Sequence, residues 1–362
     1  MTASATEVTN TGTGREEPVI GTSKNATASM TRDTRFLYAS ARIRSMENSM
    51  VTGERLERLL EMKNASDVLS AIGDCGFVPV RREDGSTDRE ATLDAVLEGA
   101  YRTVLGMVPE PEVFRFMQYP YDCNNIKAAL KAFTRGIDPM DMMFGIGTVP
   151  PEAVAKMPET KDWSLLPTHM AKAAGEAAEA YAKTLNPQKI DLILDRACYE
   201  DMLEFVLAGR SEYAIRLVKT KIDLTNFMIA IRILRMGGGR VGEALLHDAL
   251  LPGGTVSLEE IFRLYGEGET KFVEALTYGA YAPFAKRIQS GNGTLAEIEC
   301  ASDNEFMEYV RKAKMVPFGY EVAIGYLYGM EYAVKNVRII LAGKDAGLAS
   351  DVLRERVRTS YV

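Results

Sequence analysis

The first candidate for a chemical function in this chain is a glycine-rich turn. It reads Gly237-Gly-Gly239-Arg-Val-Gly242 and matches the pattern GxGxxG. In dinucleotide-binding proteins this pattern follows a β-strand, and its backbone N–H groups hold a pyrophosphate. The preceding residues, Phe227–Met236, carry Arg232 and Arg235 at helical spacing, which a buried parallel strand would not. We therefore expect a helix that ends in a loop. A soluble enzyme with a nucleotide site at Gly237–Gly242 is the alternative function, and a strand before Gly237 would support it.

Other catalytic and metal-binding patterns are weaker. Gly343-Lys344 lacks both the upstream glycine and the following Ser or Thr of a phosphate loop. The only two histidines, His169 and His247, leave little room for a histidine-based metal site or acid–base centre. The cysteines form no CxxC pair and are expected to be small buried residues in a reducing cytoplasm: Cys75, Cys123, Cys198 and Cys300. The sequence predicts no catalytic residue, no cofactor and no metal.

The composition excludes two further classes of function. The chain has 362 residues, of which 46% are apolar and 26% charged, as in soluble proteins of two or three domains. A net charge of −7 argues against a nucleic-acid partner, which needs basic surface to displace counterions. The longest uncharged stretch, Ala275–Ala285, falls short of the roughly 18–20 apolar residues that span a bilayer. We expect no direct membrane insertion.

The apolar residues follow a helical period through most of the chain. Leu93–Leu105 place them at i, i+3, i+4 and i+7, which gives one apolar face on a helix. Phe77-Val-Pro-Val80 is too short to predict a sheet, so the predicted class is all-α. Residues 1–34 are rich in Ser and Thr without an apolar block, and we predict a disordered tail, with Met30 as an alternative start.

Three segments share one internal pattern: an acid, an asparagine, a bulky apolar residue, and an apolar stripe that ends near a base. The asparagines lie about 100 residues apart, much farther than the roughly 34–47 residues of helical solenoid repeats. Because an amide donates and accepts at once, it can join neighbouring elements. We predict structural corners at Asn125, Asn226 and Asn336, where three acids cap or pair, namely Asp122, Asp223 and Glu331. The helices that follow are expected to stop at Gly136, Gly237 and Gly343.

This pattern predicts three similar helical repeats, residues 35–136, 137–239 and 240–362, in a pseudo-threefold body with a central opening. Gly325 and Gly329 form a GxxxG pair, which we interpret as close helix packing in the core. Five arginines are predicted to pair with acids between repeats or to contact a partner: Arg42, Arg44, Arg232, Arg235 and Arg338. A generic helical adaptor would show shorter units and is the remaining alternative.

Several of these segments, taken in order, resemble a known family. They are Tyr38-Ala-Ser-Ala-Arg42-Ile-Arg44, Tyr121-Asp122-Cys-Asn-Asn125, Ile222-Asp223-Leu-Thr-Asn226, Pro317-Phe-Gly319, Lys335-Asn336-Val-Arg338 and the closing Arg354–Val362. Together they resemble the C subunit of the V-type rotary ATPases, including the archaeal and bacterial A/V-type enzymes, a family that also contains the eukaryotic d subunit. The resemblance covers about residues 35–362. Two departures are the extension 1–34 and Cys123, where the family often has an aromatic residue or histidine.

The resemblance implies a non-catalytic subunit shaped as a funnel of three helical domains. Such a subunit lies on the cytoplasmic end of the membrane rotor ring and receives the central shaft, made of the D and F subunits, in its opening. It would rotate with both and transmit torque for ATP-linked proton or sodium transport. The resemblance also allows contact with the stator membrane subunit. It implies a cytoplasmic, peripheral location on the inner face of the membrane, through the complex.

Overall fold

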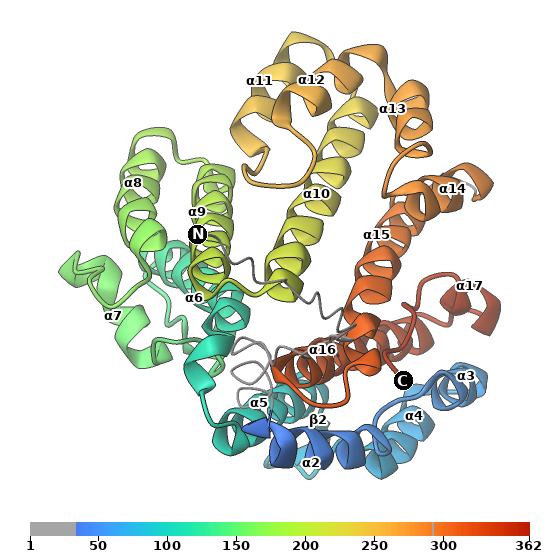
Figure 1. The fold of residues 1–362 in the computed structure, drawn as a ribbon. Coiled ribbons are helices and arrows are strands. Elements are labelled where there is room, and N and C mark those ends of the chain that lie inside the picture. The colour runs from blue at the N-terminus through green and yellow to red at the C-terminus, as the bar shows by residue number, and fades with distance from the viewer. Residues whose placement is uncertain (1–33, 292) are drawn as a thin grey trace, which may run out of the picture.

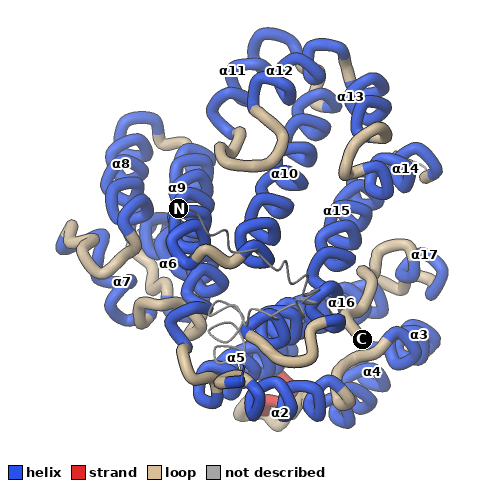
Figure 2. The backbone as a smooth tube through the Cα atoms, in the orientation of Figure 1, coloured by secondary structure: helices blue, strands red, loops and turns tan. Residues whose placement is uncertain are grey.

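The computed structural model describes residues 34–291 and 293–362, so the predicted tail 1–34 lies outside the described residues except at Thr34. Most of the described chain is helical, which confirms the predicted all-α class (Figures 1 and 2). Within it the strands β1 (Val80–Arg81) and β2 (Thr87–Asp88) form one short antiparallel pair.

Helices follow one another along the whole described chain. The described chain starts with α2 (Leu37–Glu47), α3 (Gly53–Glu61), α4 (Ala65–Ala71) and α5 (Arg89–Met107). The next are α6 (Arg115–Arg135), α7 (Pro151–Thr160), α8 (Thr168–Thr184) and α9 (Pro187–Gly209). Then come α10 (Glu212–Arg235), α11 (Gly239–Ala249), α12 (Leu258–Glu267), α13 (Glu269–Leu276), α14 (Ala282–Ser290), α15 (Leu295–Val310), α16 (Tyr320–Asp345) and α17 (Ser350–Arg354).

Side-chain caps account for many of the helix starts. Thr52, Asn64, Asp88, Ser211 and Ser257 each accept a hydrogen bond from a backbone N–H of the first turn that follows. These N–H groups have no partner inside the helix, so a short polar side chain at this position stabilises the first turn. The beginnings of these five helices are therefore encoded locally, by single residues.

The helices gather into bodies around the long helices α6, α10 and α16 (Figure 1). α6 packs with α7, α8 and α9, and α10 packs with α11, α12 and α15. α16 packs against α2, α4 and α5, so the end of the chain completes the core of its beginning. This pairing joins the two ends of the described chain.

The glycines of α16 serve packing. A Cβ at Gly329 would lie 2.8 Å from Met50 Cε and 2.8 Å from Tyr361 Cβ, and one at Gly325 would meet Ala313 at 2.7 Å. Both glycines therefore allow close packing in the core, as predicted. Their neighbours, however, lie in the turn after α2, in the short 3-10 helix Arg311–Met315 and in the C-terminal segment, and not in another long helix. The predicted helix stop at Gly343 is wrong: α16 continues to Asp345, and Gly343 is buried, where a Cβ would collide with Leu353.

The other two helix stops occur near their predicted positions. α6 ends before Gly136, which has the left-handed conformation with φ 64°. α10 ends at Arg235, shortly before Gly237 with φ 106°. The segment before the glycine-rich turn is thus a helix, which excludes the dinucleotide-binding alternative at Gly237–Gly242. Within the described part of the chain, no helix is long and apolar enough to cross a membrane.

Candidate functional site: a polar cavity between the long helices

Each predicted corner asparagine is buried and binds the backbone of one residue in a later loop. Asn125 donates to the carbonyl of Phe144 (2.9 Å) and accepts from its N–H (2.8 Å). Asn226 does the same with Leu251, at 2.8 Å for both bonds. Asn336 binds Arg358 at 2.8 and 2.7 Å. The three amides are at most 1% exposed, so these paired bonds to the loops are shielded from water.

Two of the three acids hold the same loops. Asp122, three residues before Asn125, accepts from the backbone N–H of Thr148 (3.1 Å) and Val149 (3.1 Å) and from the Thr148 hydroxyl. Asp223, three residues before Asn226, binds the corresponding groups of Thr255 and Val256. Burial raises the pKa of Asp122, and the bonds from the loop oppose that rise.

Glu331 has a different role from these two acids. It lies five residues before Asn336, and the position that matches Asp122 and Asp223 is Ala333. Its Oε1 instead accepts hydrogen bonds from the hydroxyls of Tyr101 (2.6 Å) and Tyr121 (3.0 Å). Glu331 therefore contacts α5 and α6 and does not hold the third loop. That loop is bound by Asn336 together with Asp303 and Asn304 of α15.

The two loops that Asp122 and Asp223 bind share a short sequence motif, which the repeated asparagine pattern does not include. Both acid-bound loops read Gly-Thr-Val, as Gly147-Thr148-Val149 and Gly254-Thr255-Val256. In each, a Cβ on the glycine would collide with the aspartate carboxylate that the next two residues bind. A search for a second repeated motif downstream of each asparagine would have found them.

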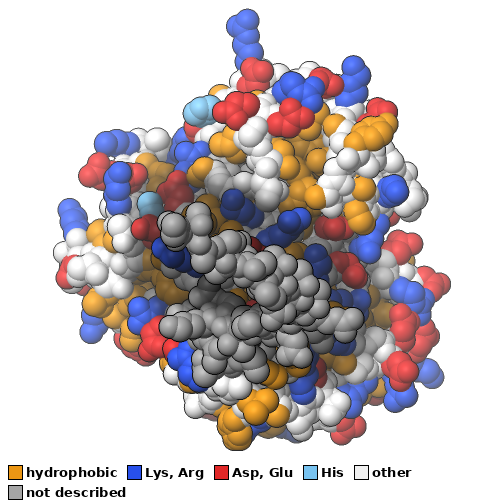
Figure 3. Space-filling model, in the orientation of Figure 1, with side chains coloured by type: hydrophobic (Ala, Val, Ile, Leu, Met, Phe, Trp, Pro, Cys, Tyr) orange, Lys and Arg blue, Asp and Glu red, His pale blue; other side chains and the backbone are white. Residues whose placement is uncertain are grey.

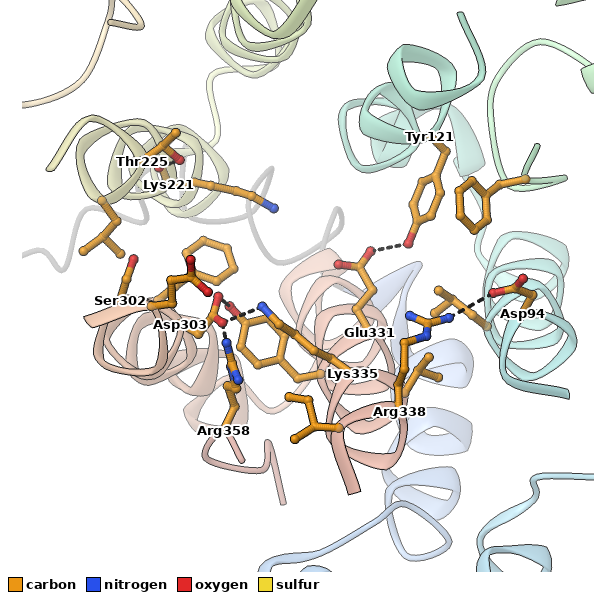
Figure 4. A pocket seen from close by; sticks show the side chains of 18 residues that line it. Asp94, Tyr121, Lys221, Thr225, Ser302, Asp303, Glu331, Lys335, Arg338 and Arg358 are labelled. Carbon is orange, nitrogen blue, oxygen red and sulfur yellow. Dashed lines mark hydrogen bonds and ion pairs between the residues drawn. The ribbon is translucent and has the colours of Figure 1, made fainter. Parts of the chain in front are cut away.

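A cavity of about 790 Å³ lies between α5, α6, α10, α15 and α16 (Figure 4). Its lining includes Phe144 and Arg358, two of the residues whose backbone the corner asparagines hold. Asn125 and Asn336 thus position part of the cavity wall without reaching the cavity themselves.

Most charges at the cavity wall are already paired. Asp303 accepts from Lys335 and from Arg358 Nε (2.8 Å), and Arg338 binds Glu90 (2.9 Å) and Asp94 (3.3 Å). Burial opposes the charged form of Asp303, but the two cations together hold its pKa below its usual value. These pairs stiffen the contacts of α16 with α15 and α5.

Two charged groups of the cavity stand outside any ion pair in the described part of the chain, Lys221 and Glu331. Lys221 extends from α10 towards the side of Glu331 (Figure 4), and its Nζ lies 5.3 Å and 5.2 Å from the ring centres of Phe306 and Tyr328. Burial raises the pKa of Glu331, and the Lys221 ammonium and the two tyrosine hydroxyls oppose that rise. Because no salt bridge among the described residues uses these two side chains, an incoming group could pair with either of them. Sequence reasoning missed Lys221 because it lies in no motif.

Four of the five predicted arginines join different elements of the chain, and Arg42 does not. Arg44 of α2 binds the carbonyls of Ala313 and Val316, both at 2.9 Å. The others pair with acids of another helix: Arg232 with Glu299, Arg235 with Glu269, and Arg338 with Glu90 and Asp94. Arg42 is exposed and donates to Tyr38 of its own helix at 3.1 Å. On the face shown in Figure 3, acidic and basic side chains of the described residues are interspersed.

The described chain is thus a helical body in which buried polar side chains hold loops beside a polar cavity. Comparison with known proteins assigns its class: residues 39–356 match the ATP synthase (C/AC39) subunit family. The chain belongs to this family and is a subunit of a rotary ATPase.

Relatives of known name agree with this assignment. The chain is 23% identical to the C subunit of the A-type ATP synthase of Thermococcus onnurineus, with 90% of each chain covered. It is 24% identical to the C subunit of the A-type ATP synthase of Methanocaldococcus jannaschii, over 88% of this chain and 85% of the relative. It is 20% identical to the C subunit of the V-type sodium ATPase of Enterococcus hirae, over 88% of this chain and 97% of the relative.

Proposed function

We propose that this chain is a non-catalytic coupling subunit of the central stalk. In this proposal its three helical repeats form a funnel that receives the shaft, made of the D and F subunits, and its outer end rests on the membrane rotor ring. It transmits torque between ATP chemistry and the transport of protons or sodium ions. It is held at the inner, cytoplasmic face of the membrane by its partners, with the stator membrane subunit as a further contact.

The observation that carries this proposal is the cavity between α6, α10 and α16, together with the way its wall is held. A torque-transmitting socket needs stiff walls, because any compliance stores the applied work as deformation. The buried asparagine bonds and the ion pairs of α16 supply such stiffness. Lys221 and Glu331 offer an ammonium group and a carboxyl group, neither in a salt bridge among the described residues, to the side chains of a shaft.

The proposal is tested by capture of a purified D–F shaft complex on the immobilised full-length chain. We expect binding that weakens as salt rises, since exposed charge pairs are screened over about 8–10 Å at physiological ionic strength. Lys221→Glu should weaken capture at least about tenfold, which corresponds to about 1.4 kcal/mol.

Lys271→Glu is the matched control, because Lys271 is exposed on α13 and does not line the cavity. It makes the same charge change and should leave capture unaltered. Failure of the unmodified chain to capture the shaft at low salt would overturn the socket. Equal losses in the two variants would show that net charge, and not the cavity, governs binding.

A further inference from the structure

A hollow of about 530 Å³ lies beside the glycine-rich turn that joins α10 to α11, near the end of the molecule opposite α2 (Figure 1). Its lining includes Gly237–Gly239 and Gly266–Gly268, the segments that lead into α11 and α13. Gly238 and Gly268, the residues before the two helices, have φ angles of 53° and 89°, which glycine adopts without a steric penalty. Two helices therefore begin at this hollow.

The first turns of both helices have no cap. Backbone N–H groups in a first turn have no acceptor inside the helix, and the side chain before the helix usually binds one of them. Gly238 and Gly268 have no side chain that could do so. Among the described residues, the N–H groups of Gly239–Val241 and Glu269–Lys271 make no hydrogen bond. These donors, at the positive ends of two helix dipoles, favour an anion.

The hydroxyl of Tyr265 also lacks a partner at this place. Tyr265 lines the same hollow and is 6% exposed, and its buried hydroxyl has no hydrogen-bond partner within the described part of the chain. The hydroxyl lies against the glycine-rich turn, since a Cβ on Gly238 would be 3.4 Å from it and one on Gly242 2.5 Å. A buried hydroxyl without a partner is unfavourable and rare. An acceptor oxygen bound in the hollow would satisfy it.

The charged groups of the hollow include a cation without an ion pair. Arg240, in the first turn of α11, is exposed and makes no ion pair among the described residues. Glu267 already pairs with Arg263 of its own helix, whereas Glu243 of α11 has no cationic partner in the same part of the chain. The groups without partners are therefore donors, except for the Glu243 carboxylate, which would repel an anion.

We propose that the hollow binds a phosphate group through the first-turn N–H groups of α11 and α13, the Arg240 guanidinium and the Tyr265 hydroxyl. A phosphate offers several acceptor oxygens, which donors from different directions can bind at once, and a guanidinium can bind two of them. This differs from a dinucleotide site, because a helix and not a strand precedes the turn. Two sources supply such a group: the free ion, and a phospholipid headgroup, whose acyl chains the exposed Met236 and Val241 beside the turn would contact.

The first test is a titration of the full-length chain with inorganic phosphate, followed by phosphorus NMR. Arg240→Gln should weaken binding at least about tenfold, because it removes a charged donor. Tyr265→Phe should weaken it about 2- to 10-fold, and this variant should fold because the hydroxyl has no partner among the described residues. Glu243→Gln should tighten binding, because it removes the carboxylate that repels the anion.

Two matched controls make the same chemical changes elsewhere. Arg216→Gln removes an exposed guanidinium near the start of α10, and Tyr278→Phe removes the hydroxyl of a tyrosine that is 84% exposed. Neither residue lines the hollow. Both variants should bind phosphate as the unmodified chain does.

Vesicle sedimentation separates the two sources of the phosphate group. It compares vesicles of equal parts phosphatidic acid and phosphatidylcholine with vesicles of phosphatidylcholine alone. A lipid source predicts a preference for the first kind, which Met236→Ser should reduce without changing the binding of the free ion. This variant should fold because Met236 is 78% exposed. A free-ion source predicts binding in the NMR titration without any preference between the vesicles.

Two results would overturn the phosphate site. The first is that the unmodified chain neither binds inorganic phosphate nor prefers the vesicles with phosphatidic acid. The second is that Arg240→Gln and Arg216→Gln lose equal affinity, which would mean that general charge attraction governs binding. The hollow does not include Lys221 or Glu331, so capture of the shaft tests the proposed socket independently.

Discussion

At the residue scale, each corner asparagine makes two hydrogen bonds to the main chain of a single loop residue. Neither a shorter nor a charged side chain reproduces this, because only an amide offers a donor and an acceptor side by side. Loss of the amide leaves both a buried N–H and a buried C=O without partners, and that desolvation cost exceeds the net value of the bonds themselves.

Asn226→Ala should therefore lower the free energy of unfolding by about 1–3 kcal/mol. Asn226 is fully buried and its partner Leu251 is 2% exposed, so water cannot readily replace the amide. Urea denaturation measures the effect. Gln188→Ala, at an exposed position in the first turn of α9, is the control and should change the stability little. An unchanged midpoint for Asn226→Ala would contradict a structural role.

Asp303 predicts a pH-dependent contribution to stability. Its folded-state pKa is lowered by Lys335 and Arg358, despite burial, so its stabilising effect is present above the unfolded pKa of about 3.9 and is lost as the pH falls through the lower folded value. Asp303→Asn should cost about 1–3 kcal/mol at neutral pH, because Arg358 loses its carboxylate, with the 22% exposed side chain of Asp303 favouring the lower part of that range.

Denaturation at several pH values measures this. The difference between Asp303→Asn and the unmodified chain should shrink steadily as the pH falls below about 3.9. A difference that is constant with pH would mean that the charge of Asp303 is not what stabilises the fold.

The asparagines were predictable from the sequence because they recur with the same neighbours. Lys221 and Asp303 were not, because their importance comes from what other helices bring towards them. Glu331 was found for the wrong reason: its acid type fits the repeat, but its partners, Tyr101 and Tyr121, come from α5 and α6. A local sequence pattern identifies residues that bind segments close to them in the sequence. It misses residues whose partners come from distant helices on the other side of the cavity.

At the element scale, α16 is distinguished by burial on nearly all sides. Its residues include Gly325, Gly329 and Gly343, each of which lets another side chain come close to the helix backbone. A glycine in a helix interior normally costs roughly 0.5–1 kcal/mol relative to alanine. Here that cost is offset by packing that a Cβ would prevent.

Two glycine-to-alanine changes should thus have opposite signs. Gly329→Ala should destabilise the protein by about 1–3 kcal/mol, because the new methyl group would overpack against Met50 and Tyr361. Gly99→Ala, within α5, where no atom lies within 4 Å of the added Cβ, should stabilise by about 0.5–1 kcal/mol. Thermal melting compares them, and stabilisation by both would contradict the packing role of Gly329.

The wrong prediction that a helix stops at Gly343 is also explained at the scale of the helix. Glycine is common at helix ends and also at close helix contacts, and the sequence around Gly343-Lys344 does not separate these uses. Gly347, with φ 68°, lies just beyond the end of α16. The helical class and many helix starts were predictable from the local apolar pattern and the capping residues. The end of α16 was not, because it depends on how Leu353 packs against Gly343.

At the scale of the whole molecule, the first and last parts of the described chain form one body. Tyr361 is 1% exposed and packs against Gly325 and Gly329 of α16, and the carbonyl of Val362 accepts from the N–H of Gly53 at 3.2 Å. The three repeats 35–136, 137–239 and 240–362 remain a prediction. A linear division of the sequence could not foresee that α2–α5 would pack on α16, because contacts between distant segments leave no periodic signal.

Tyr361→Ala should loosen this body. The cavity it leaves should cost about 3–5 kcal/mol, as for other large aromatic residues in cores. Hydrogen exchange should rise in α2, α3 and α16 before it rises in α8 and α9. Tyr361→Phe is the control: it keeps the ring that packs against Gly325 and Gly329 and removes only the hydroxyl, so stability should change by less than about 1 kcal/mol. Uniform exchange across all helices would contradict a separate body.

The packing of α2–α5 on α16 also bears on how the chain folds while it is being synthesised. At about 5–20 residues per second, the ribosome needs on the order of ten to forty seconds to make the residues between α5 and α16. Throughout that interval the apolar faces of the first helices lack their main partner, while α6–α9 can already pack with one another. The nascent chain therefore passes through a long-lived state with exposed apolar surface, and its yield in cells should depend on chaperones more than its final stability would suggest.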